Sequence, residues 1–155
     1  MSDVKHLSAI QKQIVVAAPI ERTFKVFTTN MTTWWPKHFT VGPTPFVECV
    51  VEPRVEGRWF ERAADGVESL WGKVLVWQPP TRVVLAWQLD GNFKYDPSLI
   101  TEVEVRFTSL GAASTRVDLE HRNIDRFGDH AAKVGPMMDG GWGGIMQSFA
   151  QAAQG

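Results

Sequence analysis

The sequence has almost no cysteine: of its 155 residues only Cys49 carries a thiol. A disulfide bond within the chain is therefore excluded, and one thiolate cannot build a cysteine-rich zinc site. Histidines are also few, and they show no ligand spacing among themselves: His6, His38, His121 and His130. The sequence therefore predicts no metal site and no cofactor.

An excess of charge of either sign is missing too, because 16 lysines and arginines face 17 aspartates and glutamates and the net charge is −1. With the basic residues scattered along the chain, this balance argues against a nucleic-acid partner or an anionic membrane surface. Residues 1–13 lack the apolar core of a signal peptide, and no run reaches transmembrane length. We expect a reduced, cytoplasmic protein with a single domain over residues 1–155.

Short catalytic motifs are absent as well. The glycine-rich run DGGWGG at 139–144 does not follow a strand in a βαβ unit, so it does not qualify as a phosphate-binding loop. No nucleophile-elbow string occurs, although composition alone leaves a Ser/His/Asp triad open. The sequence predicts no catalytic residue.

Seven tryptophans are the most unusual feature that the sequence does contain. The first two follow a predicted strand over residues 10–17 and a predicted helix over residues 19–30, whose apolar side chains recur at helical spacing. Asn30 can cap a second, short helix that contains Trp34 and Trp35.

From residue 46 to residue 122 the hydrophobic period changes to two, which predicts six strands joined by short turns in an antiparallel meander. The last two strands separate apolar from charged positions most clearly. One face of this pair carries Thr101, Val103, Val105, Phe107, Val117, Leu119 and His121. The sheet should therefore have one buried face and one face in contact with water.

A final helix over residues 137–151 is predicted to cover the buried face of the sheet, after a boundary at Gly135 and Pro136. Its apolar stripe consists of Met138, Trp142, Ile145, Phe149 and Ala153. The fold class is α+β: a strongly bent antiparallel sheet of about seven strands wrapped around a long C-terminal helix, with two short helices after the first strand.

Taken together, several strings resemble the START/Bet v 1-like (SRPBCC) superfamily and, within it, the homologues of the activator of Hsp90 ATPase. They are VVAAPIERTFKVFT, VEPRVEGRWFERAADG, WGKVLVWQPPTRVVLAWQ, TEVEVRF, TRVDLEHR and GGWGGIMQSF. The resemblance implies a helix-grip fold with a hydrophobic cavity between the sheet and the last helix.

The residues expected to line such a cavity are mostly inward-facing strand positions and the stripe of the final helix. They are Trp34, Trp59, Glu61, Trp71, Trp87, Val103, Val105, Phe107, Val117, Leu119, His121, Met138, Trp142, Ile145 and Phe149. Aromatic side chains of this kind suit an apolar ligand pocket, but any single one of them more often simply fills the core. Trp34 and Trp35 could lie at the cavity mouth or pack the short helices down.

Two polar residues share the inward parity. His121 falls on the same face as Leu119, where a buried imidazole needs hydrogen-bond partners and can orient a ligand or act as an acid or base. More often such a histidine is a satisfied core residue. Glu61 shares parity with Trp59, so a Glu61–His121 pair becomes possible if Trp59 points inward.

Four glycines weaken the start of the final helix: Gly140, Gly141, Gly143 and Gly144. Together they cost roughly 3–4 kcal/mol relative to alanine. Gly141 and Gly143 flank the apolar stripe, where a missing side chain would let the helix approach the sheet. Gly140 and Gly144 point away, and we hypothesise that they soften the helix so that it can lift and admit a ligand. Alternatively, 139–141 is a loop and the helix begins at Trp142; an exposed Gly140 and Gly144 would also suit a homodimer interface.

Three functions are open at this point. The first is binding of a small hydrophobic or aromatic ligand in the cavity, and the second is a protein-interaction module that contacts a chaperone, as the family description implies. The third is a cyclase- or hydrolase-like enzyme, which would require His121 or Glu61 to face the cavity with a perturbed pKa.

Overall fold

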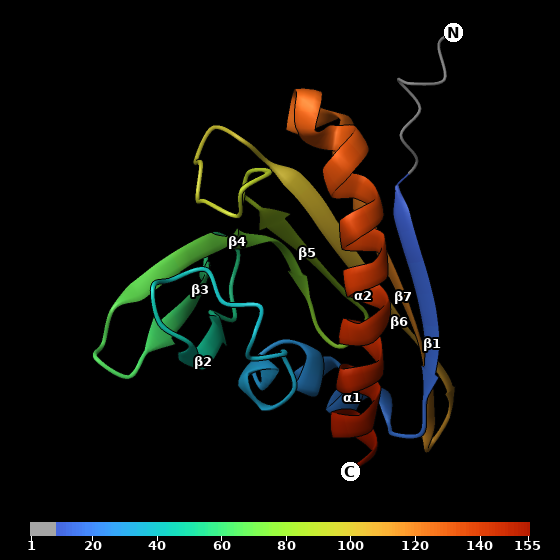
Figure 1. Ribbon diagram of the computed structural model, residues 1–155. Coiled ribbons are helices and arrows are strands. Elements are labelled where there is room, and N and C mark those ends of the chain that lie inside the picture. The colour runs from blue at the N-terminus through green and yellow to red at the C-terminus, as the bar shows by residue number, and fades with distance from the viewer. Residues whose placement is uncertain (1–8) are drawn as a thin grey trace, which may run out of the picture.

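The alternating segments form one antiparallel sheet of seven strands, which curls into a half-barrel around a long helix in the computed structural model of the protein (Figure 1). The structure describes residues 9–155, so His6 and the first eight residues lie outside the described part of the chain. Along the sheet the strand order is β1-β7-β6-β5-β4-β3-β2. The strands are β1 (Ile10–Val16), β2 (Phe46–Val51), β3 (Arg58–Ala63), β4 (Glu68–Gln78), β5 (Arg82–Trp87), β6 (Thr101–Gly111) and β7 (Ser114–Arg122).

The helices are α1 (Ile20–Phe27), the 3₁₀ turns η2 (Met31–Thr33) and η3 (Ile124–His130), and α2 (Ala131–Gln154). Helix α2 runs across the concave face of the sheet and packs against β1 and α1 (Figure 1). Its C-terminal end is held by Arg22 of α1, whose guanidinium donates to the carbonyl oxygens of Ala153 at 2.7 Å and Gly155 at 2.8 Å. These bonds supply donors that the last turn of a helix lacks. No helix in residues 9–155 is both long enough and apolar enough to cross a membrane.

The two faces of the sheet differ as the alternation predicts. In β7 every second residue is buried, and its neighbours are partly exposed. On the outer face Glu104 is nevertheless only 7% exposed, because Arg82, Arg106 and Arg122 cover it at 2.6–2.9 Å. Burial acts to raise the pKa of this carboxyl, but the hydrogen bonds from Arg82 and Arg122 outweigh it and leave the pKa below its usual range.

The prediction of a second helix with two tryptophans is wrong in its extent. Only the single turn of η2 forms, the side chain of Asn30 makes no capping bond, and Trp34 and Trp35 follow the turn. Trp34 lies in the core, where its Nε1–H donates to the carbonyl of Val26 at 2.6 Å. Burial of the two indoles therefore fixes this segment, rather than helix propensity.

Helix α2 begins at Ala131, six residues before the predicted start, and Pro136 lies inside it. Proline has no N–H for the carbonyl four residues earlier, so the helix loses one bond near its start. Val134 and Met138 are buried on either side of this position and hold the helix on its course. The alternative that 139–141 forms a loop before Trp142 is also wrong.

The helical glycines do not have the packing role predicted for them. A methyl group built on Gly140, Gly141, Gly143 or Gly144 would meet no atom within 4 Å beyond the helix itself. The explanation of Gly141 and Gly143 by close approach to the sheet is therefore wrong, because each position has open space for a side chain. The softening of the helix that we infer for Gly140 and Gly144 remains a prediction.

Candidate functional site

A cavity of about 310 Å³ opens between the first half of α2, the loop after η2 and the loop after β5. Its size falls at the lower end of the range of small-molecule sites. Four indoles contribute to the wall: Trp35, Trp71, Trp87 and Trp142. The remaining lining residues are His38, Phe39, Thr40, Val41, Leu89, Phe93, Met137, Met138, Gly141 and Ile145. The wall is therefore almost entirely apolar.

Five tryptophans form a closed circuit of ring contacts, which we call the tryptophan circuit: Trp35, Trp71, Trp59, Trp87 and Trp142. Consecutive ring centroids are 5.0, 5.4, 5.7 and 6.0 Å apart, and Trp142 returns to Trp35 at 5.8 Å. All these contacts are tilted or edge-to-face, the arrangements that aromatic quadrupoles favour. Trp59 belongs to the circuit but does not line the cavity. The other four rings form the aromatic wall, and their contacts within the circuit hold them in place.

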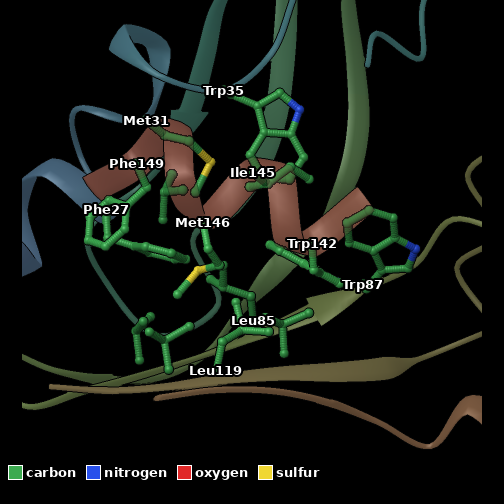
Figure 2. Close-up of a cluster of buried hydrophobic side chains, with 14 of the residues drawn as sticks. Phe27, Met31, Trp35, Leu85, Trp87, Leu119, Trp142, Ile145, Met146 and Phe149 are labelled. Carbon is green, nitrogen blue, oxygen red and sulfur yellow. The ribbon is translucent and has the colours of Figure 1, made fainter. Parts of the chain in front are cut away.

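Side chains of α2 and of the strands share a single buried layer beside this circuit. Figure 2 shows Ile145, Met146 and Phe149 of α2 in the same cluster as Leu85 and Leu119 of the sheet. Each of the five is at most 5% exposed. Beyond the cavity, side chains such as Met146 and Phe149 therefore occupy the space between α2 and the sheet.

Glu61 of β3 is 2% exposed and its carboxylate accepts four hydrogen bonds. Oε1 accepts from the backbone N–H of Val41 at 2.6 Å and from Trp71 Nε1 at 2.9 Å. Oε2 accepts from the Thr40 hydroxyl at 2.6 Å and from the N–H of Gly42 at 3.1 Å. One buried carboxylate thus fixes both the loop after η2 and one indole of the cavity wall.

The Glu61→Gln variant should lose about 2–3 kcal/mol of unfolding free energy, because an amide replaces a buried anion that accepts four bonds and turns an N–H₂ group toward donors. Urea denaturation would measure the loss. Glu48→Gln is the matched control: Glu48 is an exposed partner of Arg62, and its loss should stay below about 1 kcal/mol. Equal stability losses in the two variants would contradict the anchoring role of Glu61.

His121 of β7 is fully buried and both its ring nitrogens are used. Nδ1 accepts from the indole N–H of Trp142 at 3.1 Å, which places the imidazole proton on Nε2. Nε2 then donates to Thr101 Oγ1 at 2.7 Å, and the Thr101 hydroxyl donates to the Trp87 carbonyl at 3.3 Å. Burial lowers the pKa of His121 to about 3. The imidazole is therefore a neutral link between α2 and the sheet.

Neither Glu61 nor His121 lines the cavity, and the two do not pair with each other. Trp59 does point inward, at 0% exposure, and Glu61 with it. Phe60, which faces outward, is covered instead by the guanidinium groups of Arg58 and Arg62. The geometry that an enzyme based on His121 or Glu61 would need is absent from the cavity.

Residues 17–154 match the family model described as "Activator of Hsp90 ATPase homolog 1-like protein". The chain belongs to this family. The family and the helix-grip fold inferred from the sequence strings are thereby confirmed. No curated protein sequence matches the chain.

Three solved structures of this fold illustrate the range of its relatives. An anthrahydroquino-gama-pyrone synthase, Txn09, solved in complex with SUM, is 36% identical over 92% of this chain and 95% of that chain, with a TM-score of 0.67. The self-sacrificing resistance protein CalC from Micromonospora echinospora is 32% identical over 96% and 95%, with a TM-score of 0.73. The Aha1 dimer from Colwellia psychrerythraea is 17% identical over 95% and 96%, with a TM-score of 0.64, which shows the fold alone.

The structure of this family member brings five of the fifteen predicted site residues to the cavity: Trp71, Trp87, Met138, Trp142 and Ile145. The other ten are buried in the core at no more than 4% exposure and do not reach the cavity: Trp34, Trp59, Glu61, Val103, Val105, Phe107, Val117, Leu119, His121 and Phe149. Of the first tryptophan pair, Trp35 lines the cavity and Trp34 packs against Phe27.

Most of the lining residues that the sequence did not single out come from loops. Residues 38–41 follow η2, and Phe93 lies in the loop after β5. Hydrophobic periodicity says nothing about such segments. A usable signal was present at Phe93, because an aromatic residue beside the turn-forming pair Asp90–Gly91 is an exposed apolar side chain in a polar loop.

Proposed function

We propose that the protein binds a small planar aromatic ligand in the cavity beneath the first half of α2. The observation that carries the proposal is the cavity itself, which is walled by four indoles and otherwise by almost only apolar side chains. Planar aromatic molecules can stack on these rings or meet them edge-on. Because the rings are held by one another and by Glu61 and His121, the site is formed before the ligand arrives, which lowers the entropic cost of binding.

The two relatives above 30% identity support a small-molecule function. One is named as an anthrahydroquino-gama-pyrone synthase, and the other as a self-sacrificing resistance protein. A chaperone-contacting role rests on the family description and on a dimeric relative that shares the fold alone. The apolar cavity favours ligand binding over a protein partner, and the binding tests below distinguish these two roles.

Substituting Gly141 by leucine should block the cavity without unfolding the protein. Gly141 lines the cavity and has open space for a side chain, so a leucine there would occupy the volume that a ligand needs. In the native protein we expect naphthalene to quench the tryptophan fluorescence saturably, and in Gly141→Leu we expect its affinity to fall at least tenfold, as for the loss of about 1.4 kcal/mol of contact.

Gly140→Leu is the matched control, since Gly140 lies on the same helix, is exposed and does not line the cavity. Both variants gain similar helix propensity. Unchanged naphthalene affinity in Gly140→Leu with lost affinity in Gly141→Leu would support the proposal. Native mass spectrometry of the protein from its own host would then identify a co-purifying ligand. No saturable quenching in the native protein would overturn the proposal and favour a protein partner.

A further inference from the structure

The two polar side chains of the interior that the sequence singled out as possible ligand contacts, Glu61 and His121, are already bonded, whereas the buried indole nitrogens of Trp59 and Trp87 have no hydrogen-bond partner within residues 9–155. The carboxylate of Glu61 has four donors, and both nitrogens of His121 have partners. Neither side chain lines the cavity. A polar group of the ligand must therefore be recognised by side chains other than Glu61 and His121.

Only two side chains of the cavity wall carry a polar group other than an indole N–H: His38 and Thr40. Both belong to the loop after η2, on one side of the opening. His38 is exposed and its ring packs at a tilt against Phe39 at a centroid distance of 4.2 Å, while Thr40 is half-buried. The cavity thus has an apolar interior and one polar edge at its mouth.

The hydroxyl of the lining residue Thr40 can only accept a further hydrogen bond. Its Oγ1 lies 2.6 Å from Glu61 Oε2, and such a short contact to a carboxylate commits the hydroxyl proton to that bond. The remaining lone pairs of Oγ1 can accept a hydrogen bond but cannot donate one. The negative charge of the Glu61 carboxylate next to Oγ1 favours a ligand group that directs a hydrogen with partial positive charge toward Thr40. A ligand hydroxyl suits this position, and a carbonyl or carboxylate does not.

We propose that the ligand is a hydroxylated aromatic, such as a phenol or a fused-ring phenol, whose O–H donates to Thr40 Oγ1 while its rings lie against the tryptophan circuit. His38, the other polar side chain of the wall, has one donor and one acceptor nitrogen when neutral and can bond the same hydroxyl. This inference rests on the proposed function, because it names the chemical class that the same cavity selects.

Three probes that share one ring system test the inference: naphthalene, 2-naphthol and 2-methoxynaphthalene. In an apolar cavity without a matching acceptor, the hydroxyl would weaken binding because it loses water. We expect instead that the native protein binds 2-naphthol about three- to tenfold more tightly than either of the other probes, as one hydrogen bond allows. Titration calorimetry on the full chain would measure the three dissociation constants.

Variants of the loop then locate the contact. In Thr40→Val the preference for 2-naphthol over naphthalene should disappear, and Thr40→Ser should keep the preference. His38→Leu should reduce the preference, and His130→Leu, an exposed histidine outside the cavity wall, should not. Equal or tighter binding of naphthalene by the native protein, or a preference that survives Thr40→Val, would overturn this inference and leave the proposed function standing. Binding of none of the three probes would overturn the proposed function itself.

Discussion

Replacing the four helical glycines 140, 141, 143 and 144 by alanine should raise the unfolding free energy by about 3–4 kcal/mol. Each glycine lies in the interior of α2, and each has open space where a methyl group would go. Alanine therefore gains helix propensity and restricts the unfolded chain without a steric cost in the folded one. Urea denaturation would measure the increase as a higher midpoint concentration, with the dependence of the unfolding free energy on urea concentration unchanged.

Gly72→Ala provides the opposite control, because a methyl group on this β4 residue would collide with the carbonyl oxygen of Ala86 on β5. That variant should be strongly destabilised, whereas the variant with alanine at the four α2 positions should be stabilised.

The alanine variant also tests the softening of the start of α2. In the native protein, amide exchange over residues 138–146 should be faster than in the rest of α2, and the alanine variant should slow it. Uniform exchange along α2 in the native protein would disprove a soft helix start.

Acid should destabilise the protein through His121 in particular. The imidazole has an ordinary pKa near 6.5 when unfolded, and burial lowers its pKa to about 3 in the fold. Between these values the unfolded chain binds a proton that the folded chain does not, so stability falls as the pH falls. The slope approaches about 1.4 kcal/mol per pH unit about one unit below pH 6.5, so about 2 kcal/mol is removed between pH 6.5 and 4.5. Well above pH 6.5 both states are neutral at this residue and the effect vanishes.

His121→Gln separates this contribution from that of the carboxylates. Glutamine offers an acceptor to Trp142 and a donor to Thr101 but does not titrate in this range. Subtracting the two curves of stability against pH cancels the groups common to both proteins. The difference should grow by about 2 kcal/mol from pH 6.5 to 4.5. A difference that does not change with pH would show that His121 is protonated in the fold. Nitrogen chemical shifts of the imidazole would report the Nε2–H tautomer directly.

The sheet could be predicted from the sequence because each strand repeats one physical constraint every two residues. In β7 the inward positions Val117, Leu119 and His121 are buried and the residues between them are not, as the alternation requires. The turns between strands carry glycine and proline, which also act locally. Such local signals suffice to assign six consecutive strands between residues 46 and 122.

The helix boundaries and the cavity could not be predicted in the same way, because they depend on packing between distant segments. Pro136 and the glycines of α2 argue locally against a helix, yet the burial of Val134, Met138 and Trp142 along α2 holds one there. Parity placed Glu61 and His121 on the correct face. It could not show that the loop after η2 and Trp142 would occupy their polar atoms.

The tryptophan circuit also couples the five indoles optically, so that they emit as one group. Five indoles whose neighbours lie 5.0–6.0 Å apart transfer excitation energy among themselves much faster than they emit. Emission therefore comes from whichever ring has the lowest excited state, wherever the light was absorbed. A molecule bound beside any one ring should quench the whole group, and the coupled transitions should give a strong near-ultraviolet circular dichroism signal that changes when the cavity fills.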